Sequence, residues 1–336
     1  MNRASRWAAP LALALLLGHG AAAAQASAQA SAPEASASAP VPPGQGTAYT
    51  EKGADTCLSC HDPDSDSPGF STAAIFKTAH AQRGNPHAPF GKGNLQCEAC
   101  HGPGAAHASR GSNKKATINS FKSTSFLPVQ KRNDACLGCH QDAVRNAWHE
   151  GAHDRNQVAC TSCHKVHSEH DAVRDKVDQA EVCYTCHKQE RADFQKASTH
   201  PVRFGLMSCS GCHNAHGSSS SAMLIKTTVN QTCYTCHAEK RGPLLWEHPP
   251  VVEDCTLCHT PHGAARQALL NKSPPLLCQQ CHSQAGHPSV ARTAAGLPSV
   301  AGDGGNGAVY LVAGSCVNCH TQVHGSNHPS GSKLLR

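Results

Sequence analysis

The stretch CTSCHKVH, residues 160–167, is the unit from which the rest of the sequence is built. It holds a C-x-x-C pair, a histidine directly after the second cysteine, and another histidine three residues further on. C-x-x-C-H is the attachment sequence of c-type haem, because two thiols add to the haem vinyl groups and the next imidazole lies under the iron. The second histidine, His167, then needs an iron of its own.

The same motif occurs ten times and uses all 20 cysteines. It predicts ten covalently bound haem c groups, and it makes internal repetition the organising feature of the chain. The predicted thioether cysteines are Cys57, Cys60, Cys97, Cys100, Cys136, Cys139, Cys160, Cys163, Cys183, Cys186, Cys209, Cys212, Cys233, Cys236, Cys255, Cys258, Cys278, Cys281, Cys316 and Cys319. The predicted proximal ligands are His61, His101, His140, His164, His187, His213, His237, His259, His282 and His320.

Two other uses of C-x-x-C pairs are disfavoured. Zinc sites need ligands in groups of four, whereas here every pair carries its own histidine in the fifth place. A thioredoxin-like redox motif would occur once, on a strand-to-helix turn. The regular histidine therefore favours haem.

Residues 1–24 have the organisation of a secretory signal peptide. Arg3 and Arg6 form the charged part, residues 10–17 the apolar part, and three alanines at 22–24 a cleavage site. The apolar part is shorter than the roughly 20 residues of a spanning helix, which disfavours a retained anchor. Residues 25–49, rich in Ala, Ser and Pro, predict a disordered tether. Export agrees with c-type haem, which bacteria attach outside the cytoplasmic membrane.

The composition predicts that porphyrins form the core. Aromatic residues make up 4% of the chain and there are three methionines, so side chains alone would pack poorly. We expect a multihaem cytochrome c fold of mostly short helices and loops wrapped round a haem chain, with very little sheet. The formal net charge is +6, but loss of the two leader arginines and about one negative charge per ferric haem bring the mature holoprotein to roughly −6. A nucleic-acid-binding function is not supported.

The second axial ligands are predicted from histidines outside the motifs. A lone histidine and a histidine that trails a motif alternate five times. The lone ones are His80, His153, His200, His248 and His287, and the trailing ones are His107, His167, His216, His262 and His324. A trailing histidine leaves the chain on the same side as its motif histidine, so it must bind a neighbouring haem. Because each such unit links two neighbouring haems, the repeats predict a continuous series of closely spaced haems. Which histidine binds which haem stays open.

Four histidines of the mature chain are left over and are interpreted as surface groups or as partners of the ligands: His87, His149, His170 and His328. Two choices are close. His149 and His153 are one helical turn apart, and we prefer His153 because G-A-H echoes T-A-H at His80 and S-T-H at His200. The same echo favours His80 over His87.

The ten motifs, the units CHGPGAAH (100–107) and CHNAHG (212–217), and the closing CVNCHTQVHGSNHPSGSKLLR (316–336) resemble the MtrA/DmsE-type decahaem cytochromes of porin–cytochrome conduits. The resemblance covers essentially the whole mature chain. It implies an elongated rod of two pentahaem halves, residues 50–190 and 191–336, located in the periplasm and partly inserted in the outer membrane. The implied partners are an outer-membrane β-barrel porin of the MtrB/PioB type, periplasmic or inner-membrane cytochromes, and an outer-surface multihaem cytochrome or reductase.

The spare histidines decide between classes of function. An electron conduit needs every iron closed by two imidazoles, whereas a reductase needs an open iron. Ten candidates for ten irons favour a non-enzymatic electron-transfer protein without catalytic residues, used in metal or dimethyl sulfoxide reduction or in ferrous iron oxidation. The alternatives are a periplasmic multihaem reductase or a soluble periplasmic electron shuttle. The long spacers 102–135 and 283–315 are either partner-binding loops or plain surface. The longest apolar stretch after the leader, at 309–313, is too short to span a bilayer.

Overall fold

The computed structural model describes residues 45–62, 72–91, 95–111, 114, 117–142, 145–283 and 316–335. The predicted signal peptide, residues 25–44 of the predicted tether, the apolar stretch 309–313 and nearly all of the 283–315 spacer lie outside these residues. His287, one of the predicted ligands, also lies outside them.

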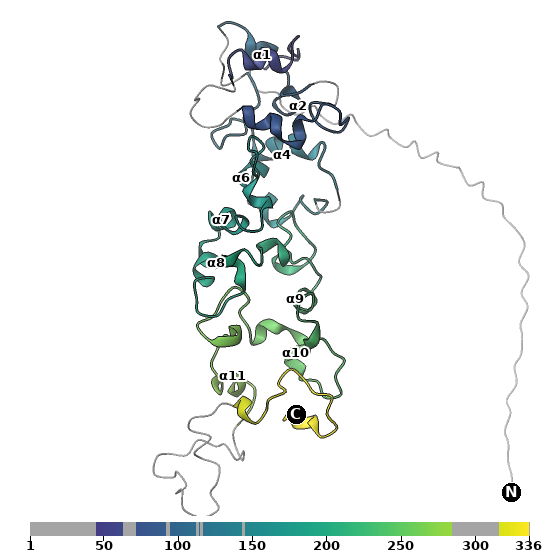
Figure 1. Cartoon of the computed structure of the whole chain (residues 1–336), viewed down its shortest axis with the longest axis vertical. Helices are drawn as coiled ribbons and strands as arrows, with labels where there is room; N and C mark the ends of the chain where they lie inside the picture. The colour runs from purple at the N-terminus through teal and green to yellow at the C-terminus, as the bar shows by residue number, and fades with distance from the viewer. Residues whose placement is uncertain are drawn as a thin grey trace, which may run out of the picture. The chain divides into compact units, whose positions relative to one another are not determined.

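The described chain consists of short helices joined by loops (Figure 1). The α-helices are α1 (Ala54–Leu58), α2 (Glu98–His101), α3 (Ala105–Ala108), α4 (Val129–Leu137), α5 (Ala152–Arg155), α6 (Cys160–Cys163), α7 (Gln179–Tyr184), α8 (Lys188–Asp193), α9 (Val229–Cys233), α10 (Pro249–Glu253) and α11 (Leu276–Gln279). The 3₁₀-helices are η1 (Ala73–Lys77), η2 (Ala79–Ala81), η3 (Ala172–Arg174), η4 (Pro201–Phe204), η5 (Cys209–Gly211), η6 (Ser221–Met223), η7 (Ala238–Lys240), η8 (Cys255–Leu257), η9 (Gln267–Leu269), η11 (Cys316–Asn318) and η12 (Gly331–Lys333).

Sheet is absent from the described residues apart from four isolated antiparallel bridges. The prediction of short helices and loops with very little sheet is therefore confirmed. Two of the bridges repeat each other: Ser198 pairs with Ala264, and Trp246 pairs with Ser326. Each joins the residue two before a lone histidine to the residue two after a trailing histidine. The elongated form and the two halves stay predictions.

Each C-x-x-C-H motif forms one helical turn. In all ten, the histidine backbone N–H donates to the carbonyl of the first cysteine at 2.9 or 3.0 Å, the i to i−4 bond of an α-helix. The turn explains why the spacing is fixed. It places two thiols and one imidazole on a single turn of backbone, which is the arrangement that one porphyrin requires.

The hydrophobic core is small and divided. Two clusters of buried apolar side chains occur in the described residues: Ala180, Tyr184, Phe194 and Val202 in one, and Ala54, Ile75 and Phe90 in the other. No side chain among these residues is less than 2% exposed. A chain of this length normally buries far more apolar surface, so the polypeptide alone supplies little hydrophobic stabilisation. No helix in the described part of the chain has the length and apolar character to cross a membrane.

Candidate haem sites

Nine of the ten predicted distal histidines lie in the described residues, and each faces the ring of a proximal histidine with ring centres 5.9–6.4 Å apart. The pairs are His61–His107, His80–His140, His101–His167, His153–His187, His164–His216, His200–His237, His213–His262, His248–His282 and His259–His324. The tenth proximal histidine, His320, is described, but its predicted partner His287 is not.

This separation is the one that two ligands of a single iron need. A histidine nitrogen binds a metal at about 2.0 Å and lies about 1.2 Å from its ring centre, so two rings across one ion have centres about 6.4 Å apart. Ordinary aromatic packing also covers about 4.5–7 Å. However, the interplanar angles of the nine pairs range from 6° to 81°. The pairs therefore share a distance and not a packing geometry, which fits an ion between the rings.

The pairs follow a rule along the chain. Each trailing histidine faces the proximal histidine of an earlier motif, as His262 faces His213. Each described lone histidine faces the proximal histidine of a later motif, as His200 faces His237. One pair joins the two predicted halves, because His164 faces His216 with ring centres 6.1 Å apart. The predicted ligands in residues 50–190 therefore do not pair only among themselves, because one of them faces a histidine of residues 191–336.

Neighbouring motifs meet through their cysteines. A hydrogen bond between the two thiols raises the pKa of Cys57 and lowers that of Cys97. Equivalent hydrogen bonds between thiols raise the pKa of Cys136, from Cys160, and the pKa of Cys183, from Cys209. Burial, followed by the nearby Cys255 and Cys316 thiols, raises the pKa of Cys233 and of Cys278 to about 11.

The second cysteines make the alternate contacts. Burial, and then the thiols of Cys139, Cys186, Cys236 and Cys281, raise the pKa of Cys100, Cys163, Cys212 and Cys258 respectively. For Cys212 the Cys233 thiol contributes more than Cys236. Each motif therefore lies next to the motif that follows it in sequence, along the whole series of ten.

Hydrogen bonds fix the orientation of the imidazoles. The Nδ1 atoms of His101, His213, His259 and His320 lie 2.6–2.8 Å from the carbonyl oxygens of Asn119, Ala222, Ala268 and Lys333. A carbonyl only accepts, so each Nδ1 donates its proton and leaves the Nε2 lone pair for a metal. Ala222 and Ala268 both have φ of 53°, a conformation that is costly for residues other than glycine, so these turns are strained in the geometry that aims the carbonyl.

Three of the lone histidines hold segments that carry trailing ones. His153, His200 and His248 each donate from Nδ1 to the carbonyl before a trailing histidine, at Ala215, Pro261 and Val323, over 2.8 Å. The donor and the trailing histidine face different motifs. Each of these bonds therefore couples the geometry of two ring pairs.

Glycine follows three of the trailing histidines, and the backbone there is tightly packed. A Cβ at Gly217 would lie 2.1 Å from the Ala147 carbonyl oxygen, and one at Gly263 would lie 2.0 Å from that of Asp193. No side chain fits at these distances. The glycine in CHNAHG and CHTPHG is therefore required for the approach of a second backbone segment.

Burial favours the neutral imidazole that an iron needs. Burial lowers the pKa of His101, which also contacts the Phe121 ring edge-on with centres 5.3 Å apart. Burial likewise lowers the pKa of His80, His107, His140, His216, His262 and His324. Because a protonated imidazole cannot bind a metal, this shift keeps the ligands in their binding form.

A set of buried amides was missed by the sequence analysis. Asn133 donates to the Val158 carbonyl and accepts from the Cys160 N–H, and Asn230 makes the equivalent bonds to Val251, Val252 and Cys255. Gln179 has the same role, donating to Val173 and accepting from the Ser210 N–H. The signal in the sequence is an amide three or four residues before the first cysteine of the third, fifth and seventh motifs.

The leftover histidines lie apart from the nine pairs. His149 is exposed, with its Nδ1 atom 3.9 Å from the Asp154 carboxylate. His170 is 2.7 Å from Asp178, and the His328 Nδ1 contacts the Ser330 hydroxyl at 2.8 Å. His87 is also exposed. The 102–135 spacer is not a plain loop, since it contains α3 and most of α4 and supplies the Asn119 carbonyl to His101.

A continuous cavity of about 3090 Å³ passes the last six motifs. Its walls include the motif histidines from His187 to His320 and the distal histidines His153, His200, His248, His262 and His324. Thiols, imidazoles and apolar side chains are the groups that c-type haem contacts. The residues present therefore fit haem c.

Two families match parts of the chain. Residues 97–178 match the family described as cytochrome c-type protein NrfB-like, and residues 200–242 and 248–287 match the doubled CXXCH motif. The NrfB proteins of Escherichia coli O6:H1 and Haemophilus influenzae are 26% and 28% identical over 148 and 153 residues, which is 42% and 40% of this chain and 70% and 65% of theirs.

A longer match covers most of the sequence. The chain is 45% identical over 289 residues to the multiheme cytochrome MtrA of Shewanella baltica, and the match covers 86% of this chain and 83% of that protein. Identity at this level over this length agrees with the motifs and with the absence of strands from the described residues. The chain belongs to the MtrA family of multihaem cytochromes.

Proposed function

We propose that this chain is a decahaem c-type cytochrome that carries electrons between the periplasm and the cell exterior through an outer-membrane barrel. Each motif would hold one haem c by its two cysteines and its proximal histidine. The nine ring pairs supply both axial ligands for nine irons, and His287 is the proposed second ligand for His320. The carrying observation is the common ring separation of 5.9–6.4 Å.

When bound, the haems supply one-electron ferric/ferrous couples. The residues of the chain hold each iron from both sides, orient the imidazoles through their Nδ1 bonds, and keep consecutive motifs in contact. Two imidazoles leave no coordination position for a substrate, which supports electron transfer over the alternative of a reductase. Contacts between successive cysteines support a single series of sites rather than separate clusters.

Membership of the MtrA family supports the remaining parts of the proposal. The protein would lie in the periplasm and partly within a porin of the MtrB/PioB type, with periplasmic or inner-membrane cytochromes on one side. A soluble periplasmic shuttle is the alternative. The two differ in one requirement, since only the conduit needs the barrel.

Vesicles test this requirement directly. The barrel, with or without this cytochrome, is reconstituted in vesicles that enclose a reduced viologen dye, and a ferric oxidant is added outside. We expect rapid oxidation of the dye only when both proteins are present. A variant with Cys160→Ala and Cys163→Ala, which lacks the fourth site of the series, is expected to slow this oxidation strongly. Equal rates with the barrel alone would contradict the conduit.

A further inference from the structure

The motif at residues 160–164 departs from a regular series. In the second, sixth, eighth and tenth motifs, the proximal Nδ1 donates to a backbone carbonyl. In the fourth motif, the Nδ1 of His164 lies 2.7 Å from Oδ2 of Asp171. This bond therefore goes to a carboxylate, whereas those of the other four motifs go to a backbone carbonyl.

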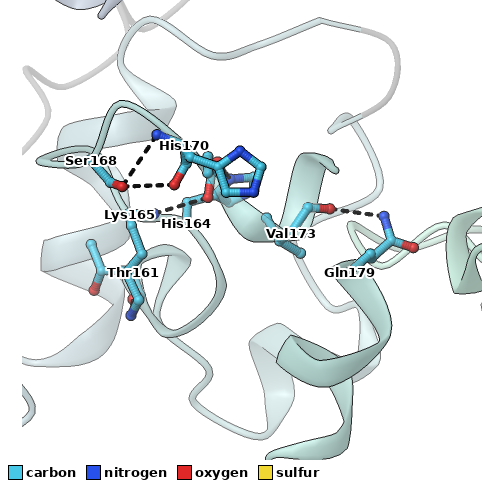
Figure 2. Close-up of polar contacts among 8 residues, drawn as sticks. Thr161, His164, Lys165, Ser168, His170, Val173 and Gln179 are labelled. Carbon is cyan, nitrogen blue, oxygen red and sulfur yellow. Dashed lines mark hydrogen bonds and ion pairs between the residues drawn. The ribbon is translucent and has the colours of Figure 1, made fainter. Parts of the chain in front are cut away.

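Asp171 is held in position by its own loop. Its Oδ1 atom accepts the Lys165 backbone N–H at 3.1 Å, and its side chain is 20% exposed. Figure 2 shows the loop, in which the Ser168 hydroxyl donates to the His170 carbonyl at 2.7 Å. Hydrogen bonds within the loop therefore hold the carboxylate beside His164, so that it is not a freely rotating surface group.

Two other proximal histidines have carboxylates near them, but at longer distances. The Nδ1 atoms of His187 and His237 lie 3.6 Å from Glu190 and Glu239, beyond hydrogen-bond range, and both glutamates are at least one-third exposed. Screening by water makes such contacts weak. The bond of His164 is accordingly different in kind from these ion pairs.

A carboxylate acts on an axial imidazole differently from a carbonyl. It is a charged acceptor, so it draws the Nδ1 proton more strongly and raises the basicity of Nε2. A more basic ligand stabilises the ferric state, which carries one more positive charge than the ferrous state. The effect lowers the reduction potential of the iron that the imidazole binds.

We propose that Asp171 is a positioning and tuning residue that makes the haem at residues 160–164 harder to reduce than its counterparts at 209–213 and 255–259. The inference rests on the proposed haem ligation. Reduction adds one electron to the iron, and the proton stays between Nδ1 and the carboxylate. Because His216 from the other predicted half supplies the second ligand, the low-potential site lies where the two halves share a ring pair.

The test is redox titration of the full-length mature protein carrying Asp171→Asn. We expect one haem's share of the absorbance change to titrate at a higher potential, by about 59 mV. For a one-electron couple this shift is a tenfold change in the reduction equilibrium constant. Asp171→Ser, which also removes the charge, is expected to give the same shift and serves if the asparagine variant does not mature.

Asp178→Asn is the matched control. It removes a carboxylate that is also 2.7 Å from a histidine, His170, which is not a predicted ligand, so the titration should stay unchanged. Haem count and spin state test the ligation independently of the role of Asp171. Fewer haems or high-spin iron in the unmodified protein would overturn the proposed ligation. An unshifted titration in Asp171→Asn with full haem content, or a high-spin haem in that variant, would overturn the tuning role of Asp171.

Discussion

The segments that carry the trailing histidines are held differently near the two ends of the described chain. In the described residues 198–283 and 316–334 the structure repeats: His200 donates to Pro261 and His248 to Val323 at the same 2.8 Å, and each is preceded by an equivalent bridge. In the N-terminal region, His107 instead contacts the Thr117 hydroxyl at 3.2 Å. The turn beside it is tied by Glu98, a buried carboxylate that accepts from Thr50 and Gly104.

The ring separations do not follow this difference. The pair His61–His107 has ring centres 6.3 Å apart, and the pairs His213–His262 and His259–His324 have 6.0 and 6.1 Å. Segments that are held by different hydrogen bonds thus give nearly the same separation between ring centres. The common distance is therefore not the product of one scaffold, which agrees with the proposed iron between the two rings.

The largest expected effect comes from removing one distal histidine in each region. His107→Ala and His262→Ala should each convert one haem to high spin, because the iron loses one of its two imidazoles. Electron paramagnetic resonance of the ferric proteins measures this. The two variants should give equal high-spin signals although their scaffolds differ.

His149→Ala is the control for both variants, since its ring lies outside the nine pairs. A high-spin signal from this control, or none from His262→Ala, would reverse the assignment of ligands. His153→Ala should behave like the two distal variants, because its ring faces His187 at 6.2 Å.

The sequence predicted which histidines are ligands and was silent about their pairing. The echo of G-A-H with T-A-H at His80 and S-T-H at His200 favoured His153 over His149. The pairing of His164 with His216, 52 positions apart, depends on how intervening turns fold, and no local pattern contains that information. Carbonyls such as those of Ala222 and Lys333 are invisible in sequence, because every residue has one.

A smaller effect is expected at the glycines that distinguish the two regions. Gly263→Ala should destabilise the protein by about 1–3 kcal/mol, because the new methyl group would meet the Asp193 carbonyl. In the N-terminal region, the residue after His107 is already alanine. Thermal unfolding of the holoprotein, followed by its far-ultraviolet circular dichroism, measures the change.

Gly84→Ala is the matched control for the glycine effect. Nothing lies within 4 Å of a Cβ at Gly84, so we expect an unchanged midpoint. A midpoint for Gly263→Ala that equals that of the control would mean that the Asp193 segment does not approach so closely in the haem-loaded protein.

The smallest expected difference concerns the buried amides, which both regions share. Asn230→Ala should cost about 1–3 kcal/mol of unfolding free energy, because the half-buried Cys255 N–H loses its acceptor. Asn133→Ala should cost a similar amount through Cys160. Gln231→Ala, at an exposed neighbouring position, should stay within about 0.5 kcal/mol of the parent. Unequal costs at the two asparagines would show that this tie depends on the regional scaffold.

The repeated amides also show where sequence reasoning can be extended. Asn133, Gln179 and Asn230 stand before the third, fifth and seventh motifs, so the pattern is visible in the sequence but was not recognised there. Asp171 is different, because one acidic residue seven positions after a motif histidine has no meaning until the loop brings it to His164. The ligand types could be predicted from chemistry, whereas the groups that orient them depend on tertiary structure.

The central claim is that two imidazoles close every iron of a ten-haem series. Mass spectrometry of the purified mature protein, combined with near-infrared magnetic circular dichroism of its ferric form, tests this claim most directly. We predict ten haem additions, with the near-infrared intensity of ten low-spin bis-histidine haems. Nine or fewer haems in fully matured material, or a charge-transfer band from a high-spin haem, would contradict it.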